Sequence, residues 1–316
     1  MKDNINILFI IATLEAGGAQ RTLYQLVRGL KEKNPDTVIS LINLKSNKDS
    51  LSEEFEELTD DLFHFDLPKL SLRKFKEILY FFIKIRSYPN LQLIGWMYHG
   101  SLLAWLLSLL KPSSSVYFSI HHSGVDRTNL SIRTLFIVYL LKLISYLNIN
   151  KIIYCGNNCR DVHNQFGFSE KKAKVIFNGV DHFSNIDFKK YSVTTNDNLS
   201  FRMIMAARYA EIKNHDAAFA ALNHLKRKGY KNIKLDLCGE GTGSNNIDLL
   251  EKLKQYQIEE EVTLIGVDKS FRVNIKNYDV LLLPSKSEAF PLVIPEAMLM
   301  GVPCIASSVG DIPLVI

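Results

Sequence analysis

The stretch SKSEAFPLVIPEAMLMGVPCIASS, residues 285–308, carries two glutamates, Glu288 and Glu296, into otherwise apolar surroundings. Pro291 suits the first turn of a helix, because the N–H that proline lacks would have no partner there. We therefore expect a helix from Pro291 to Met300, with Glu288 in the preceding loop and Glu296 about one turn into the helix. Carboxylates accept hydrogen bonds from vicinal hydroxyls, so the pair suits two ends of one sugar-containing ligand. The alternative is two solvated surface charges.

On the N-terminal side of this stretch, short apolar runs alternate with amphipathic segments, a pattern typical of parallel sheets covered by helices. The sequence therefore predicts an α/β fold. In the first half, we expect strands at 5–12, 37–43, 62–66, 91–96, 116–121, 151–155 and 174–177, and helices near 19–33, 71–87, 98–110, 131–148 and 157–166.

A polar stretch without sustained period, residues 178–200, interrupts this alternation, and a second doubly wound unit follows it. We expect a first domain at 1–180, a linker at 181–200 and a second domain at 201–316. Ligands bind beyond the carboxyl ends of such strands, so two facing Rossmann-like domains would form a cleft. Because the helix after the strand at 303–307 has barely begun at residue 316, we expect the second domain to be incomplete at its C-terminus.

Charge is unevenly distributed along the 316 residues: 22 Lys and Arg against 16 Asp and Glu in residues 1–180, a net of +6, and 16 against 17 in residues 181–316, a net of −1. Residues 69–86 hold six cations around an aromatic stripe, which predicts either a half-buried helix with a basic face or peripheral contact with an anionic membrane. The longest apolar runs fall short of the ~20 residues that span a bilayer. Four scattered cysteines favour a reducing compartment, so we expect a cytoplasmic protein, at the inner face of the cell membrane if 69–86 docks there.

Two places in the first half suggest ligand contacts. Gly17 and Gly18, in LEAGGAQRT, follow the first strand and open a helix, where a backbone can approach an anionic or bulky ligand closely. His121 and His122, in FSIHHSG, stand where a buried strand meets its loop. A plain strand-to-helix turn and a structural imidazole are the alternatives.

In the second half, Arg208 and Lys213 in AARYAEIKNH follow the first strand of the unit. Cations there can neutralise a departing phosphate, and arginine adds a bidentate grip; solvated surface charge is the alternative. Gly239 and Gly241 in CGEGTG mark another glycine-lined strand end. The sequence contains no Asp-x-Asp, the usual carboxylate pair for a metal-bridged diphosphate, so we expect no metal.

Together the segments GGAQR, HH, NGVD, AARYAEIKN, CGEG, VTLIG and above all SKSEAFPLVIPEAMLMGVPCIAS resemble the retaining glycosyltransferases of family 4, which have the GT-B fold. The resemblance implies transfer from a UDP- or GDP-sugar with retention of configuration, and neither metal nor other cofactor. By position, Glu288 would hold donor-sugar hydroxyls, Glu296 the ribose, and Arg208 with Lys213 the diphosphate. His121 or His122 would lie near the reacting face of the sugar. The remaining donor-binding positions would be Gly17, Gly18, Gly239, Gly241, Gly266, Ala289, Phe290, Pro291 and Leu292.

Two positions depart from the family pattern: Ala289 stands where glycine is more frequent, and Leu314 where an acidic residue is usual. The resemblance favours a metal-independent hexosyltransferase that acts on a glycan or lipid-linked acceptor in polysaccharide biosynthesis, for lipopolysaccharide or capsule. A nucleotide-sugar epimerase on the same fold and an inactive glycan-binding accessory subunit are the alternatives. We expect no nucleic-acid partner.

Overall fold

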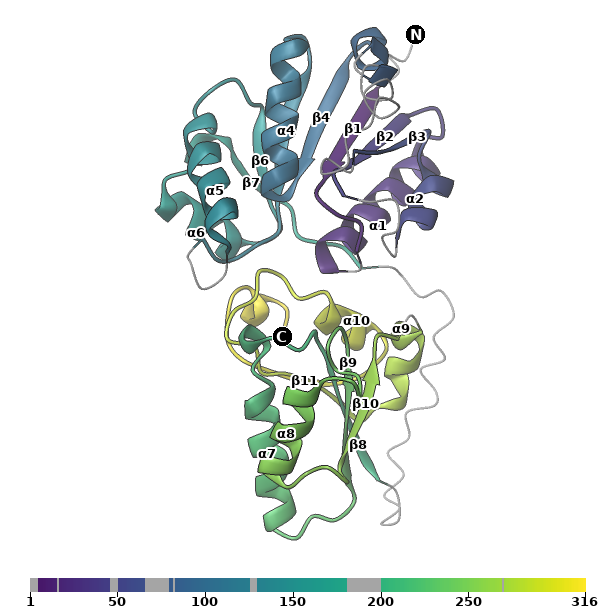
Figure 1. The fold of residues 1–316 in the computed structure, drawn as a ribbon, viewed down its shortest axis with the longest axis vertical. Coiled ribbons are helices and arrows are strands. Elements are labelled where there is room, and N and C mark those ends of the chain that lie inside the picture. Colours follow the sequence, from purple (N-terminus) through teal and green to yellow (C-terminus); the bar gives the residue numbers. More distant parts are fainter. Residues whose placement is uncertain are drawn as a thin grey trace. The chain divides into compact units, whose positions relative to one another are not determined.

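The computed structural model describes residues 5–15, 17–45, 51–65, 80–81, 83–125, 130–180, 200–268 and 270–316. The chain divides into two compact units, Met1–Gly179 and Val180–Ile316. Each is an α/β unit built on a parallel sheet (Figure 1). Residues 181–199, most of the expected linker, lie outside the described residues.

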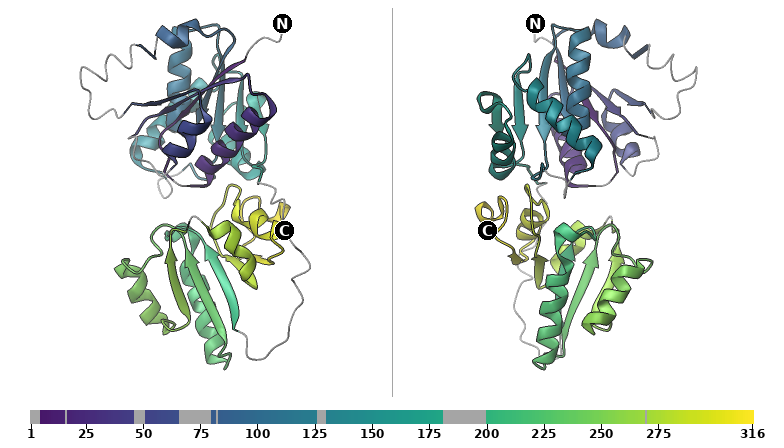
Figure 2. Two further views of the ribbon diagram at one scale, coloured as in Figure 1. Left: turned by 90° about the vertical axis from the view of Figure 1, so that its right-hand side faces the viewer. Right: turned by 60° about the vertical axis from the view of Figure 1, so that its left-hand side comes forward.

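The first unit holds a seven-stranded sheet in the order β3-β2-β1-β4-β5-β6-β7, with every neighbouring pair parallel. Right-handed crossovers in opposite directions from β1 place helices α1 and α2 on one face and α4 and α5 on the other (Figure 2). The strands are β1 (Asn6–Ile11), β2 (Val38–Asn43), β3 (Asp61–His64), β4 (Leu91–Trp96), β5 (Ser115–Ile120), β6 (Lys151–Tyr154) and β7 (Ala173–Val175). The helices are α1 (Gly18–Lys33), α2 (Ser52–Leu58), α4 (Met97–Leu110), α5 (Ile132–Ile144) and α6 (Asn157–Phe166).

Strand β1 reads NILFII and all six residues are buried, as expected of a central parallel strand covered on both faces. Helix α4 begins directly after β4 and packs very close to this layer. A Cβ at Gly100 would clash with the Ile10 carbonyl oxygen, so only glycine fits there. Met97 makes the sharp strand-to-helix turn with a φ of 62°, an uncommon conformation for a residue with a side chain. The turn fixes the start of α4 at the end of the sheet.

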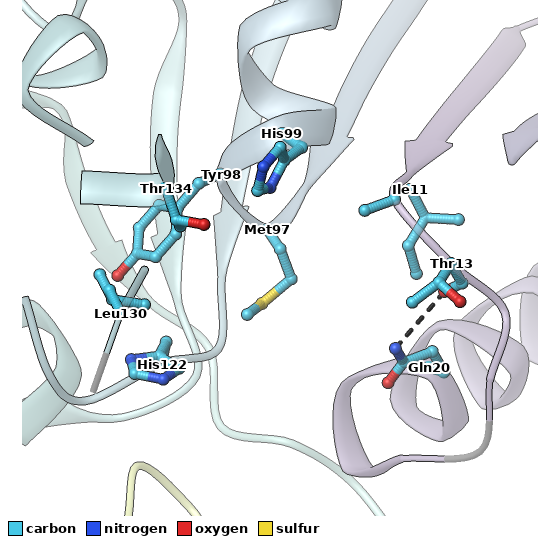
Figure 3. Close-up of a pocket in the computed structure, with 10 residues that line it drawn as sticks. Ile11, Thr13, Gln20, Met97, Tyr98, His99, His122, Leu130 and Thr134 are labelled. Carbon is cyan, nitrogen blue, oxygen red and sulfur yellow. Dashed lines mark hydrogen bonds between the residues drawn. The ribbon is translucent and has the colours of Figure 1, made fainter. Parts of the chain in front are cut away.

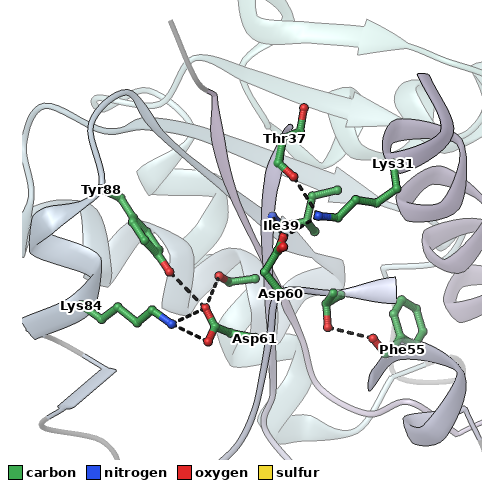
Figure 4. A network of polar contacts seen from close by, with 10 residues as sticks. Lys31, Thr37, Ile39, Phe55, Asp60, Asp61, Lys84 and Tyr88 are labelled. Atoms are coloured by element: carbon green, nitrogen blue, oxygen red, sulfur yellow. Dashed lines mark hydrogen bonds and ion pairs between the residues drawn. The ribbon is translucent and has the colours of Figure 1, made fainter. Parts of the chain in front are cut away.

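Two consecutive aspartates tie the outer strand β3 to its surroundings (Figure 4). The Asp60 carboxylate accepts hydrogen bonds from the Ile39 N–H, at 2.7 Å, and from the Lys31 ammonium, at 2.6 Å. The Asp61 carboxylate accepts from Lys84 and from the Tyr88 hydroxyl. The edge strand is thus fastened on both sides by charged groups.

Residues 69–86 can be judged only in part, because 66–79 and 82 lie outside the described residues. Phe81 is buried and its ring packs edge-on against Phe63 and Phe65, with centroids 4.7 and 5.4 Å away. Lys84 pairs with Asp61. These two side chains therefore serve the packing of the unit itself. None of the helices in the described ranges is long and apolar enough to cross a bilayer.

The second unit holds a five-stranded parallel sheet in the order β10-β9-β8-β11-β12, with its first strand β8 at the centre. Two apolar clusters form its core, one with α7 and α8 and the other with α10. The α/β class with two doubly wound sheets is therefore confirmed. The strands are β8 (Phe201–Ala206), β9 (Ile233–Cys238), β10 (Val262–Gly266), β11 (Val280–Leu283) and β12 (Cys304–Ala306), and the helices are α7 (His215–Arg227), α8 (Ile247–Tyr256), α9 (Phe271–Asn274) and α10 (Val293–Leu299).

The helix expected from Pro291 to Met300 is shorter than predicted, because α10 begins at Val293 and ends at Leu299. Pro291 instead lies in the turn before it, where its carbonyl oxygen accepts a hydrogen bond from the Ile294 N–H at 3.3 Å. The ring of proline fixes φ but does not by itself nucleate the next turn. Glu296 still lies within the helix.

Candidate functional site

The predicted donor-site residues of the second unit gather at one edge of its sheet, where all parallel strands have their carboxyl ends. Backbone hydrogen bonds join the loops that follow neighbouring strands. The Gly239 N–H donates to the Gly266 carbonyl at 2.8 Å, and the Tyr209 N–H donates to the Glu240 carbonyl at 2.7 Å. The Lys286 N–H donates to the Ile212 carbonyl at 2.8 Å. These bonds hold the loops after β8, β9, β10 and β11 in one connected edge.

Glu288 and Lys213 are in direct contact at this edge. The Lys213 Nζ lies 2.5 Å from the Glu288 Oε1, and the Ser285 hydroxyl donates to the same oxygen at 2.7 Å. Glu288 is 8% exposed and Ser285 is fully buried. A buried carboxylate is tolerated only with such partners, because desolvation of a lone charge is costly. Among the described residues, Glu288 Oε2 has no hydrogen-bond partner, so that oxygen can serve a ligand hydroxyl.

Two residues without an assigned role in the sequence shape the surroundings of Glu288. Asn214 adopts a left-handed conformation, with a φ of 57°, and its side-chain amide donates to the Pro284 carbonyl at 3.0 Å. Gly310 also has a φ of 57°, and a Cβ there would clash with the Glu288 carbonyl oxygen. The loop after β12 can therefore pass behind Glu288 only with glycine at this position.

Glu296 has a different partner. Its carboxylate Oε1 lies 2.7 Å from the Arg272 guanidinium, which α9 supplies, and Glu296 is 5% exposed. Sequence reasoning missed Arg272, because it lies in the stretch FRVNIKN, which carries no recognisable motif. The two glutamates are thus both buried and both ion-paired, but with cations from different loops.

Arg208 follows β8 and is exposed, and no ion-pair partner for it occurs among the described residues. Ala289 and Phe290 are half-buried, and Pro291 and Leu292 are buried between Glu288 and α10. Gly241 packs against Tyr209, because a Cβ added at Gly241 would lie only 3.2 Å from the Tyr209 Cβ. The edge therefore combines one open cation, two buried ion pairs and closely packed loops.

In the first unit, a pocket of about 200 Å³ opens at the carboxyl ends of β1, β4 and β5 (Figure 3). It is lined by Thr13 and Gln20 on one side and by Met97, His99 and His122 on the other, with five further residues: Ile11, Ala12, Tyr98, Leu130 and Thr134. None of the ten is a Lys, Arg, Asp or Glu residue, and burial lowers the pKa of His99, which favours its neutral ring at pH 7. The pocket therefore offers neutral hydrogen-bonding groups between apolar walls.

The two histidines of FSIHHSG have different environments. His122 lines the pocket, whereas His121 is absent from its wall and stacks on Trp96, with ring centroids 4.4 Å apart. The His121 Nε2 lies 2.9 Å from the Ser119 hydroxyl. Gly17 precedes α1 in an extended conformation and Gly18 is the first residue of that helix, next to the Gln20 that lines the pocket.

A buried chain of hydrogen bonds supports the pocket wall. The His163 Nδ1 lies 2.7 Å from the Cys159 carbonyl oxygen, which can only accept, so Nδ1 carries the hydrogen. The Tyr98 hydroxyl therefore donates to His163 Nε2, at 2.8 Å. Burial lowers the pKa of His163 to about 4 and raises the pKa of Tyr98. Both groups stay neutral at pH 7.

Comparison with known families shows to which protein family the chain belongs. The model described as "Glycosyltransferase Family 4" matches residues 16–182, which is more than half of the chain, and the model described as "Glycosyl transferases group 1" matches residues 187–316. The chain belongs to glycosyltransferase family 4.

Named relatives of this family-4 chain share modest identity with it. It is 26% identical to the putative glycosyltransferase EpsF of Bacillus subtilis over 166 residues, which cover 51% of this chain and 42% of EpsF. It is 23% identical to the amylovoran biosynthesis glycosyltransferase AmsD of Erwinia amylovora over 310 residues, which cover 95% of this chain and 80% of AmsD. This chain therefore aligns with less than half of EpsF but most of AmsD.

Solved structures show the same fold. HepE of Anabaena, in a crystal structure with UDP and glucose, superposes with a TM-score of 0.77 at 18% identity, over 99% of this chain and 83% of HepE. The GT-B fold expected from the motifs is therefore confirmed. At that identity the likeness concerns the fold, and the roles of individual side chains in this family-4 chain must come from its own geometry.

Proposed function

We propose that this chain transfers a glycosyl unit from a nucleotide-diphosphate sugar to a hydroxyl group of an acceptor, with retention of configuration. The contact between Lys213 and Glu288, at the same sheet edge as Arg208, is the observation that carries the proposal. A cation and a carboxylate held there can bind the two halves of a sugar phosphate, the anionic leaving group and the hydroxylated ring. Family membership supports this division of labour.

In the proposed mechanism, Arg208 and Lys213 neutralise the charge that develops on the diphosphate as the glycosidic bond breaks. Lys213 is already oriented by Glu288, so little reorganisation is needed in the transition state. Arg208 is exposed and can turn to grip phosphate oxygens with two N–H groups. This side-chain pair would perform the role that a metal performs in transferases with an Asp-x-Asp sequence.

The two glutamates would bind different parts of the donor. Glu288 accepts hydrogen bonds from hydroxyls of the transferred sugar, and Glu296, held by Arg272, accepts from the ribose. Gly239, Gly241 and Gly266 would let the backbone approach the nucleotide. Residues 289–292 would line the binding site of the donor sugar and the phosphates. The proposal therefore gives the two buried carboxylates separate tasks rather than an acid and base pair.

The acceptor side of the reaction would be supplied by the first unit. Its pocket has neutral polar groups and apolar walls, which suit an uncharged hydroxyl-bearing acceptor such as a glycan or the sugar of a lipid-linked saccharide. His122 lines this pocket and is the better placed of the two histidines to face the reacting sugar, while His121 would support Trp96. Gly17 and Gly18 would border the same pocket beside Gln20.

The biological setting is proposed from the relatives. AmsD is described as an amylovoran biosynthesis glycosyltransferase, and HepE was solved with UDP and glucose. A UDP- or GDP-hexose as donor and a cell-surface polysaccharide, in capsule or lipopolysaccharide, as destination agree with both. Hexosyl transfer is thus the reaction to test first.

The test is an assay of nucleoside diphosphate release from a panel of UDP- and GDP-hexoses, with and without saccharide acceptors. Release that depends on an acceptor, and that falls in Lys213→Ala and Glu288→Gln, supports the proposal. Lys286→Ala is the matched control, because Lys286 pairs with Glu211 on the surface, only two residues from Glu288. Conversion of the donor without release of diphosphate would indicate an epimerase instead, and donor binding without turnover of any kind an accessory subunit.

A further inference from the structure

Helix α5 exposes an unusual row of large apolar side chains. Ile132 is 74% exposed, Phe136 is 71% exposed and Leu143 is 65% exposed. Spacings of three and four residues place these side chains on one side of the helix. The row, which we call the α5 face, continues past the end of the helix and consists of Ile132, Phe136, Tyr139, Leu143, Tyr146 and Leu147, all more than half exposed.

The opposite side of α5 is also apolar, because Val138, Leu141 and Ile144 are buried. An ordinary covering helix of this fold is polar on its outer side, as α1 is, with Arg28 and Glu32 paired on its surface. The outer apolar row of α5 is therefore not needed for folding of the unit. Exposed apolar rows of this size usually mark a surface that contacts a partner. The adjacent helix α4 adds three exposed leucines near its C-terminal end: Leu106, Leu109 and Leu110.

The charge around the α5 face is predominantly positive. Neither α4 nor α5 contains an acidic residue. Over residues 78–172 the sequence has three acidic residues, Asp126, Asp161 and Glu170, and ten cations: Lys84, Arg86, Lys111, Arg127, Arg133, Lys142, Lys151, Arg160, Lys171 and Lys172. Two of these cations have acidic partners, because Arg160 pairs with Asp161 and Lys84 pairs with Asp61. Asp126 and Arg127 lie outside the described residues.

Several of these cations border the apolar row directly. The Lys142 ammonium lies 5.4 Å from the centre of the Phe166 ring, which packs on Tyr139 with centroids 4.8 Å apart. The Lys172 ammonium donates to the Leu147 carbonyl oxygen at the end of the row. Arg133 is exposed beside Ile132 at the start of the helix. The face therefore combines apolar and aromatic side chains with a positive border along its length.

We propose that the α5 face docks the protein on the surface of an anionic lipid bilayer. Aromatic and aliphatic side chains on one side of a helix can enter the headgroup boundary, and the lysines and arginines around them attract anionic headgroups. Charge decides between a bilayer and a second copy of the chain. Two copies that met through this face would place the same cations opposite each other with no acidic residue on α4 or α5 to offset them.

This inference goes beyond the transfer reaction and does not rest on it, because it concerns only the outer side of the first unit. It also differs from the membrane contact expected of residues 69–86, whose described part contains the buried Phe81. The α5 face was not visible in the sequence as a surface. A run such as LFIVYLLKLI gives no indication of which of its sides is covered.

The experiment is co-sedimentation of the full chain with vesicles of phosphatidylcholine alone or with about one third phosphatidylglycerol. We expect binding to the anionic vesicles to exceed binding to the neutral ones about tenfold, and to fall when salt is raised from about 0.1 M to about 0.5 M. The double variant F136E/L143E should lose most of this binding. Its matched control is I247E, which changes a side chain of α8 that is 71% exposed in the second unit and should bind as the unaltered chain does.

Circular dichroism checks that each variant is folded, which is expected because the altered side chains are exposed. Anionic-vesicle binding that F136E/L143E leaves undiminished would overturn the proposal, as would equal, salt-insensitive binding to both kinds of vesicle. Sedimentation velocity tests whether a second copy of the chain binds to the α5 face instead. A dimer that F136E/L143E dissociates, together with no binding to anionic vesicles, would assign the face to a second copy and refute the membrane proposal.

Discussion

The carboxyl ends of the two sheets share one architecture and carry opposite chemistry. In the second unit, the loops after the strands bury Glu288 and Glu296, each paired with a cation. In the first unit, the loops after β1, β4 and β5 surround a pocket whose wall, among the described residues, contains no Lys, Arg, Asp or Glu. The fold supplies the same edge twice, and the residues placed after each strand decide what that edge can bind.

The difference has an energetic side. Removal of one partner from a buried ion pair leaves the other charge desolvated and unpaired, which is expensive. A neutral pocket supported by hydrogen bonds such as that of Tyr98 and His163 carries no such liability. The carboxyl edge of the second unit should therefore be sensitive to single charge deletions, in activity and in stability, while the pocket of the first unit should not.

The largest expected effect is on activity. Arg208→Ala and Lys213→Ala should each lower kcat/KM by roughly 2 to 4 kcal/mol of transition-state stabilisation, because each removes a cation that meets the developing charge on the diphosphate. The measurement is steady-state release of nucleoside diphosphate by the full chain, with Lys286→Ala as the unaffected control. Full activity in both variants would break the assignment of charge chemistry to the second unit.

The next effect distinguishes Lys213 from Arg208 by their contribution to the free energy of unfolding. Lys213→Met should destabilise the second unit by about 3 kcal/mol, because it leaves the buried Glu288 without its cation, whereas the exposed Arg208→Met should cost almost nothing. Urea unfolding can assign the loss, since both tryptophans, Trp96 and Trp105, lie in the first unit.

The unfolding midpoint by circular dichroism should fall in Lys213→Met while the midpoint by tryptophan fluorescence stays constant. The double variant Lys213→Met with Glu288→Gln should regain part of the loss, because the uncompensated charge is gone. Equal stability of the Lys213 and Arg208 variants would show that the buried pair is not the sensitive element.

A smaller effect should appear when the pH is lowered from 7 to 5. The free energy of unfolding of each unit should then fall by about 2 kcal/mol. Burial lowers the pKa of His163 in the first unit and of His215 in the second to about 4, below the ~6.5 of an unfolded chain. Between these values the unfolded state binds the proton and the folded state does not. Stability should therefore be complete above about pH 6.5 and decrease as pH falls toward 4.

Urea unfolding at pH 7 and pH 5 measures this, and His163→Gln should flatten the pH dependence of tryptophan fluorescence while the circular-dichroism change due to His215 remains. An unchanged slope in His163→Gln would mean that another group of the first unit titrates. The loss of stability at low pH would thus be a property that the two units share.

The smallest effect distinguishes the two glutamates. Glu288→Gln should lower kcat about tenfold and change the donor KM much less, because the transferred sugar changes in the transition state. Glu296→Gln should raise the donor KM about tenfold with little change in kcat, because the ribose does not react, and Arg272→Ala should behave alike. Steady-state kinetics with donor as the varied substrate measures both, and the reverse pattern would exchange the two roles.

Much of this architecture can be predicted from local sequence. Alternating apolar runs specify strands and helices through propensity and periodicity, and the two doubly wound sheets and the family followed from them and from the motif at 285–308. Errors were local, as at Pro291, where the helix begins at Val293 instead. The sequence also singled out Lys213 and Glu288 as separate candidates, although it gave no sign that they touch.

Tertiary structure decided what periodicity cannot encode. The contact between Lys213 and Glu288 joins residues 75 positions apart, and it exists because β8 and β11 are neighbours in the sheet. Gly310 becomes the neighbour of the Glu288 backbone because β12 pairs with β11, and Arg272 becomes the partner of Glu296 because α9 and α10 share one apolar cluster. Exposure of the α5 face is likewise a property of the assembled layers. The sequence determines which segments are apolar, because that is local chemistry, whereas the packing of distant segments decides which sides are covered and which charges meet.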